Sequence, residues 1–150
     1  MQSAKLRKKF RFLPNIATAD LAYEAFGKNV SELFENAGTA IESAMVDLST
    51  LNAQEVKEIR LENESIENLL SSFLEELVFL KDSEQLLFNS IVCEVQKKDK
   101  LWILVGKLGG EKIDRNKHKL GVDVKAVTKH LFKVERLQNN TMHCQVILDV

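Results

Sequence analysis

The stretch QVILDV, residues 145–150, is apolar and β-prone to its last residue, with one carboxylate side chain at Asp149. Loose chain ends are usually polar, because an unanchored terminus does not repay the entropy lost on ordering. We therefore predict a docked β-strand here. Alternation along this strand divides the side chains between two faces. One face carries Met142, Cys144, Val146, Leu148 and Val150, and the other carries His143, Gln145, Ile147 and Asp149.

Composition indicates one ordinary globular domain over residues 1–150. With 45% hydrophobic residues, 29% charged residues and a single proline, the chain is neither disordered nor collagen-like. At this length, folding buries roughly 70% of the surface of the unfolded chain, which is enough for a real core. The formal net charge of −1 supplies no strong field for nucleic acid. Direct RNA binding is therefore not favoured by charge.

The two cysteines, Cys93 and Cys144, lie in separate apolar runs without C-x-x-C spacing. This pattern predicts buried free thiols in a reducing compartment. The basic start, MQSAKLRKKFRF, lacks the apolar segment that secretion requires, and no apolar run approaches the ~20 residues that span a bilayer. We expect a cytoplasmic protein with no membrane partner.

Periodicity predicts strands at both ends of the chain and two helices between them. Ser31 is the predicted N-cap of a first amphipathic helix, and Ser65 of a second one. Between the helices, VKEIRLENE alternates Val56, Ile59 and Leu61 with charge, as a half-buried strand does. From Glu84 onward strand patterns dominate. This order predicts an α+β fold with a mainly antiparallel sheet.

Several common catalytic patterns are absent from the sequence. The three histidines form no H-x-x-x-H or H-E-x-x-H pair, and the expected structural role of His143 is that of a half-exposed strand residue. There is no Gly-rich phosphate loop and no G-x-S-x-G elbow. A zinc site from local spacing and a self-contained nucleotide-using enzyme are both disfavoured.

Two carboxylates are the stronger candidates for a site. Asp20 precedes an expected strand, where it either caps a turn or binds a cation. Asp149 lies beside the terminal carboxylate of Val150, and it is either a solvated end residue or a ligand. Adjacent anionic groups repel unless a cation or hydrogen-bond donors compensate. Calcium or magnesium suits such oxygen ligands.

A charged segment, residues 109–130, is the second candidate. It is either a solvated mobile loop or a partner-binding loop, since loops on rigid scaffolds often carry function. Aromatic residues are too sparse there for a base-stacking platform of the RNA-binding type. The predicted partner-binding residues are Lys112, Lys117, His118, Lys125 and His130.

Five segments together resemble the archease family, and their order and spacing make the resemblance specific. They are FLPNIATADLAYEAFGKNVSELFENA, MVDLST, LEELVFLKDSEQLLF, GEKIDRNKHKLGVDVKAVTKH and QVILDV. Two positions depart from the family pattern. Ala17 stands where many relatives have histidine before the TAD triplet, and Asp123 stands where many carry glutamate.

The resemblance implies a compact α+β sandwich with two principal helices and a possible inserted subdomain at about residues 47–88. It implies a non-enzymatic accessory protein of tRNA splicing. Archeases promote guanylylation and repeated turnover of the GTP-dependent RNA ligase that joins 3′-phosphate or 2′,3′-cyclic-phosphate ends to 5′-hydroxyl ends. RNA contact is then indirect, through the ligase. The family holds a divalent metal, expected to be Ca²⁺. The positions of this sequence that match its ligands by motif are Asp20, Asp149 and Val150.

Two other functions remain open from the sequence. The first is a general chaperone or protein-interaction module, suggested by the inserted segment of the family and by the apolar stripe of the second helix. The second is a metal-dependent phosphoester hydrolase that uses Asp20, Asp149 and His130, although the sequence offers no evident base or phosphate cradle.

Overall fold

The structure is a computed structural model that describes residues 9–14 and 20–150. Ala17, one of the two departures from the family pattern, lies outside these residues. The N-terminal half contains β1 (Phe10–Leu13), β2 (Asp20–Gly27), α2 (Val30–Met45), the 3₁₀ turn η1 (Leu48–Thr50), β3 (Glu55–Asn63) and α3 (Ile66–Glu84). The C-terminal half contains β4 (Leu86–Lys98), β5 (Leu101–Lys112), β6 (Ala126–Val127), β7 (Lys133–Arg136) and β8 (Met142–Asp149).

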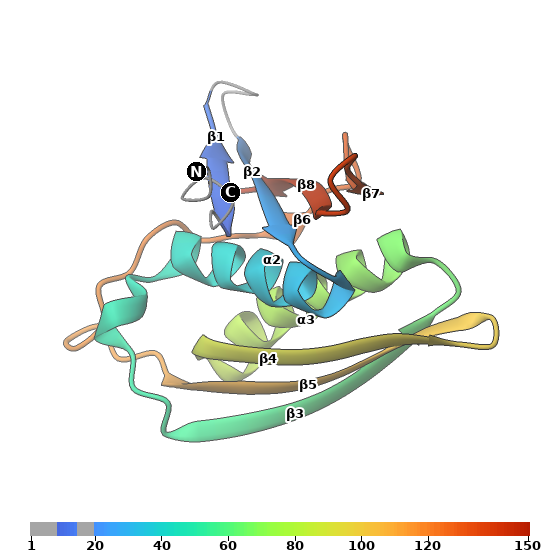
Figure 1. Ribbon diagram of the computed structural model, residues 1–150. Helices are drawn as coiled ribbons and strands as arrows, with labels where there is room; N and C mark the ends of the chain where they lie inside the picture. The colour runs from blue at the N-terminus through green and yellow to red at the C-terminus, as the bar shows by residue number, and fades with distance from the viewer. Residues whose placement is uncertain (1–8, 15–19) are drawn as a thin grey trace.

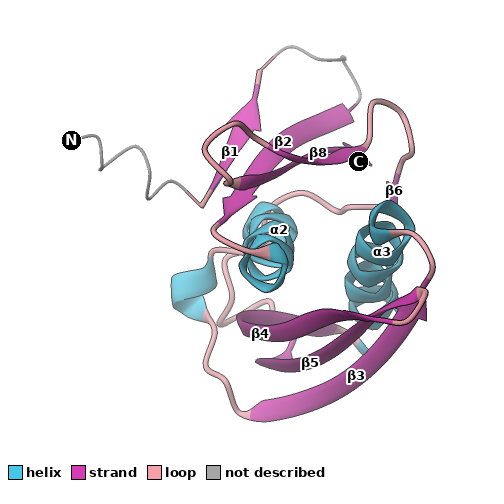
Figure 2. Cartoon of the chain, turned by 45° about the vertical axis from the view of Figure 1, so that its right-hand side comes forward, coloured by secondary structure: helices cyan, strands magenta, loops and turns pink. Residues whose placement is uncertain are grey.

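Two antiparallel sheets enclose the two helices, as Figures 1 and 2 show. One is five-stranded, in the order β1-β2-β8-β6, with β7 also paired to β8. The other is three-stranded, in the order β3-β5-β4. Every strand pair in the described part of the chain is antiparallel. The predicted α+β sandwich with two principal helices is confirmed.

The core lies where the helices face the sheets. The apolar stripe predicted for α3 is buried there, including Leu70, Phe73 and Leu77 at 0% exposure. Phe73 stacks on Phe34 of α2 with ring centroids 6.0 Å apart. Full burial of such side chains contributes about 1.5–3 kcal/mol each, so this central contact is a main source of stability. No helix in the described residues is long and apolar enough to cross a membrane.

One predicted helix cap is correct and the other is wrong. The hydroxyl of Ser65 accepts a hydrogen bond from the Asn68 N–H at 3.2 Å and caps α3 as predicted. The cap of α2 is Asn29 rather than Ser31, because the Asn29 side chain accepts from the Glu32 N–H at 2.9 Å. Ser31 lies inside the helix. Its hydroxyl accepts a hydrogen bond from the Val95 N–H of β4 at 2.8 Å.

For β8, the burial predicted from alternation is correct on the face toward the helices and wrong for His143 on the other face. Cys144, Val146 and Leu148 are fully buried against the helices. His143 is 7% exposed, so the prediction of a half-exposed residue is wrong. In β3, Val56 is 66% exposed because its parity places it on the opposite face from Ile59 and Leu61.

The predicted inserted subdomain at about residues 47–88 ends inside β4. The three-stranded sheet that begins within it continues through β4 and β5 to Lys112, since β3 and β4 both pair with β5. The hydrogen-bonded sheet therefore continues past residue 88, and the inserted subdomain stays a prediction.

Candidate functional site

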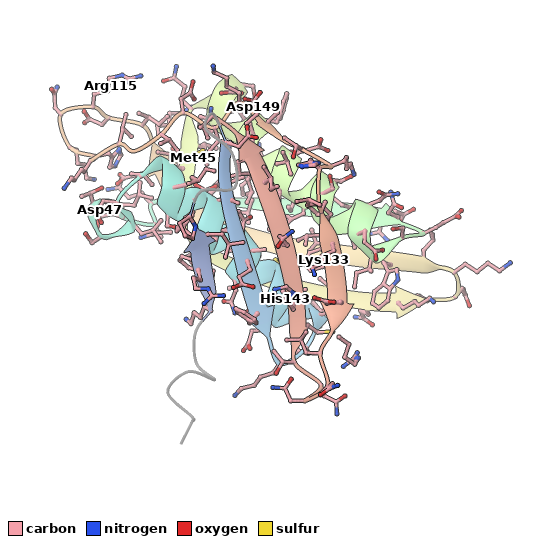
Figure 3. All side chains as sticks on the ribbon, turned by 90° about the horizontal axis from the view of Figure 1, so that it is seen from above. Met45, Asp47, Arg115, Lys133, His143 and Asp149 are labelled. Atoms are coloured by element: carbon pink, nitrogen blue, oxygen red, sulfur yellow. The ribbon has the colours of Figure 1, made fainter. Side chains whose placement is uncertain are left out.

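Asp20 and Asp149 are direct cross-strand partners at one end of the five-stranded sheet. Asp20 is the first residue of β2 and Asp149 the last residue of β8, and the antiparallel register sets them opposite each other. Opposed residues share a face of the sheet, with Cβ atoms roughly 4.5–5.5 Å apart. Asp149 is exposed and Asp20 is half-buried, and Figure 3 shows Asp149 at the end of its strand. The two carboxylates therefore form a solvent-accessible pair.

Neighbouring backbone bonds hold the end of β8 in place. The Lys125 N–H donates to the Asp149 carbonyl at 2.8 Å, and the Thr128 N–H donates to the Ile147 carbonyl at 3.0 Å. Ala126 of β6 stands opposite Asp149 on the other side of β8. Since one main-chain bond already engages the Asp149 carbonyl, its side chain is the more available ligand.

The chemistry of this pair suits a hard divalent cation. Two facing carboxylates repel each other, and an ion between them relieves the repulsion. The described residues contain no group of three His, Cys, Asp or Glu side chains arranged for a metal. An ion here would therefore complete its shell with the Val150 carboxylate, backbone oxygens or water, which are ligands that Ca²⁺ accepts. The donor set fits the metal that the resemblance implies.

A second polar cluster lies on the same face of the sheet, nearer the other end of β8, and the sequence did not predict it. His143 Nδ1 lies 2.8 Å from Glu135 Oε2, and His143 Nε2 lies 2.7 Å from Glu24 Oε1. Arg11 also hydrogen-bonds Glu24. Burial alone would raise the pKa of Glu24, but the bonds from His143 and Arg11 lower it below its usual value. The cluster joins β1, β2, β8 and β7, so it stabilises the register that pairs Asp20 with Asp149.

The charged loop is fixed at its base by Glu111. This carboxylate accepts from the Asn52 N–H at 2.8 Å, lies 2.8 Å from His118 Nε2, and accepts from Lys117 Nζ at 2.9 Å. These bonds lower the pKa of Glu111 to about 2, the Asn52 N–H being the largest cause. The Asp114 N–H donates to His118 Nδ1 at 2.9 Å, so Nε2 carries the proton that bonds Glu111.

The predicted partner-binding residues therefore do not form one surface. The His118 side chain is 1% exposed, so in this structure it organises the loop from within. Lys112 donates to the Glu84 carbonyl at 3.1 Å near the end of β5, and Lys117 lies with Glu111. Only the main chain of Lys125 adjoins the carboxylate pair, through its N–H bond to the Asp149 carbonyl, while its side chain lies with Glu75 and Phe79 of α3. Partner binding by these residues remains a prediction.

His130 lies away from the two aspartates. It is exposed in the loop between β6 and β7. Two hydrogen bonds to β8 flank it. The Thr128 hydroxyl donates to the Ile147 carbonyl, and the Gln145 side chain donates to the Leu131 carbonyl. At about 3.3 Å per residue, His130 stands roughly 10 Å along β8 from Asp149. This is too far for a shared hydrogen bond.

Asp123, the other departure from the family pattern, pairs with a lysine of α3. Lys81 Nζ lies 2.6 Å from a carboxylate oxygen of Asp123, 2.6 Å from one of Asp82 and 2.8 Å from the Val124 carbonyl. The bond from Lys81 lowers the pKa of Asp123. These side chains border a cavity of about 340 Å³ that Met45 and Arg115 also line, both labelled in Figure 3. Asp123 thus ties the charged loop to α3.

Comparisons with known proteins agree on one family. The family model described as "Archease protein family (MTH1598/TM1083)" matches residues 10–150. Protein archease of Pyrococcus furiosus is 37% identical over 133 residues, covering 89% of this chain and 94% of that protein. Protein archease of Sulfurisphaera tokodaii is 38% identical over 132 residues, covering 88% and 92%. The solution structure of Methanobacterium thermoautotrophicum protein 1598 matches with a TM-score of 0.83 at 33% identity, covering 94% of this chain and 98% of that one.

Proposed function

The chain belongs to the archease family, and on this premise we propose that it is a metal-binding accessory protein that activates a GTP-dependent RNA ligase. The ligase joins 3′-phosphate or 2′,3′-cyclic-phosphate ends to 5′-hydroxyl ends in tRNA splicing. This protein promotes guanylylation of the ligase, and so its repeated turnover, without catalysing a reaction of its own. RNA is contacted through the ligase, and the bound ion is divalent, with Ca²⁺ as the first candidate.

The observation that carries this proposal is the register pair Asp20–Asp149 at an accessible end of the sheet. Nucleotidyl transfer depends on metal ions that neutralise the charge developing on phosphate oxygens. A carboxylate pair that holds a divalent ion on one protein can supply or position the metal of another.

The other two functions receive less support from the geometry. The apolar stripe of α3, which suggested a general interaction module, is buried in the core and offers no binding surface. The hydrolase hypothesis groups His130 with Asp20 and Asp149, but His130 stands roughly 10 Å along β8 from Asp149.

The test compares Asp20→Asn and Asp149→Asn with the parent protein. Each variant removes one carboxylate and keeps the side-chain size, so we expect at least about tenfold weaker Ca²⁺ binding by calorimetry. We also expect loss of stimulation when the ligase is guanylylated with GTP. Asp99→Asn is the matched control, because Asp99 is an exposed hairpin residue with φ of 59°, a conformation that asparagine tolerates.

Thermal unfolding verifies that each variant is folded. If folded Asp20→Asn and Asp149→Asn variants both stimulate guanylylation as the parent does, the carboxylate pair is not the functional site and the proposal is wrong. If Ca²⁺ binding is lost while stimulation is kept, the ion has no part in activation.

A further inference from the structure

The two edges of the three-stranded sheet differ in how they are covered. On the β4 edge, side chains of α2 accept hydrogen bonds from backbone N–H groups. Ser31 accepts from Val95 at 2.8 Å, and Glu35 accepts from Cys93 at 2.9 Å. On the other edge, no strand except β5 pairs with β3 among the residues that the structure describes. Figures 1 and 2 show β3 at the border of this sheet. An uncovered strand edge is a template for pairing with another chain.

The outward side chains of β3 carry a pattern that decides which chain fits. Glu58, Arg60 and Glu62 are exposed and lie on the face turned away from the helices. Charges on an edge strand usually prevent indiscriminate association. Here their order is self-complementary, because a Glu and an Arg stand symmetrically about Ile59.

We propose that β3 pairs antiparallel with β3 of a second copy of this chain, with Ile59 on the two-fold axis. Such an interface is isologous, so each contact occurs twice. Glu58 then lies opposite Arg60 of the partner subunit, and Arg60 lies opposite Glu58 of the partner subunit. The two Ile59 side chains meet on the helix-facing side. The two three-stranded sheets become continuous across the interface.

The charges select this register over its neighbours. For outward-facing side chains to stay opposite outward-facing side chains, the pairing between the two strands can shift only by steps that leave every side chain on its own face of the sheet. A slip in one direction sets Glu58 against Glu58 of the partner subunit. A slip in the other sets Arg60 against Arg60 of the partner subunit and Glu58 against Glu62 of the partner subunit. Like charges directly opposite are unfavourable, so the register centred on Ile59 is favoured over both of these neighbours. A register centred on Leu61 also sets Arg60 against Glu62 of the partner subunit, but it pairs only residues 59–63, whereas the register centred on Ile59 pairs the whole of β3.

Forming the Glu58–Arg60 contacts between subunits breaks only a weak ion pair within each chain. Arg60 bonds Glu62 within the chain at 2.9 Å, and both side chains are largely exposed. Exposed pairs of this kind contribute little to stability, so Arg60 is free to change partner. Backbone hydrogen bonds between the two edges supply affinity, and the Glu58–Arg60 pairs supply specificity.

The test measures the mass of the full chain by analytical ultracentrifugation over a range of concentrations. We expect a reversible dimer of the 17.0 kDa chain. Glu58→Arg and Arg60→Glu each create two like-charge contacts, so each single variant should weaken association about tenfold or more. The double variant Glu58→Arg/Arg60→Glu restores opposite charges and should dimerise as the parent does.

Glu94→Arg is the control, because Glu94 is exposed on the same face of β4, away from the proposed interface. It should leave the dimer unchanged. A parent protein that stays monomeric at all concentrations overturns the proposal. So does a dimer that the single variants leave intact, or one that the double variant fails to restore while urea unfolding shows it folded.

Discussion

At the scale of single residues, Glu42 carries a buried carboxyl group that takes no part in the proposed metal site or dimer interface. It lies on α2 at 0% exposure, and Oε1 accepts a hydrogen bond from the Phe88 N–H at 3.0 Å. Oε2 has no partner among the described residues. Burial, the largest influence, raises the pKa of Glu42 from 4.5 to about 8. The group is therefore largely neutral at pH 7, when the same group in the unfolded chain is ionised.

This shift predicts a pH-dependent stability. Because the folded state holds the proton more tightly, the contribution of Glu42 to stability is greatest below pH 4.5 and falls as the pH rises to about 8. Glu42→Gln keeps the acceptor for Phe88 and removes the titration. It should flatten the profile between these pH values and raise the unfolding free energy above pH 8 by about 2 kcal/mol or more.

The measurement is urea unfolding at closely spaced pH values. Glu75→Gln is the control, since Glu75 is exposed on α3 and its removal should leave the slope unchanged. An unchanged slope in Glu42→Gln would mean that another group sets the pH dependence.

At the scale of elements, α2 has two functions: it fills the core and it covers the edge of β4. The residues that do the second task, Ser31, Glu35 and Glu42, follow helical spacing along one side of α2. They satisfy N–H groups of β4 that the sheet leaves unpaired. A polar stripe on a core helix thus substitutes for a neighbouring strand.

Loss of one such acceptor should destabilise the fold measurably. Glu35→Ala leaves the Cys93 N–H without its partner, so we expect a loss of about 1–2 kcal/mol in unfolding free energy. Glu35→Gln keeps an acceptor oxygen and should lose less than half as much. Chemical denaturation compares the two, with Glu75→Ala as a control for removal of a helical glutamate. Equal losses in the Ala and Gln variants would contradict the role of the hydrogen bond.

Periodicity predicted the elements well because it is local. Both helices, the strand at residues 55–63 and the last strand follow from spacing within the segment itself. The two cysteines were also predicted correctly as buried free thiols, and burial raises the pKa of both to about 12. The N-cap of α2 was wrong because Asn29 and Ser31 are both good caps, and the neighbouring β4 decides between them by engaging Ser31.

At the scale of the whole molecule, pairing between distant strands decides the site, and the sequence does not contain this directly. Alternation predicted that Asp149 points away from the buried face of β8, but only the β2–β8 register sets Asp20 beside it. The same register brings Glu24 to His143, which alternation alone had left half-exposed. Family resemblance supplied the Asp20–Asp149 pairing, whereas nothing in the sequence pointed to the Glu24–His143 contact.

The position of the pair at the end of β8 predicts an asymmetry between the two chain ends. Val150 is half-buried beside Asp149, and the Lys125–Asp149 bond holds this end of the strand in the sheet. If the Val150 carboxylate is a ligand, a short Gly-Ser extension after it replaces an anionic group with a neutral amide. We expect Ca²⁺ affinity, measured by calorimetry, to fall about fivefold or more. The same extension placed before Met1 is the control and should change the affinity little.

Equal affinities for the two extended proteins would show that the main-chain carboxylate does not bind the ion. The Asp20 and Asp149 side chains would then hold it with water alone, and such a site should exchange its ion readily with that of a partner.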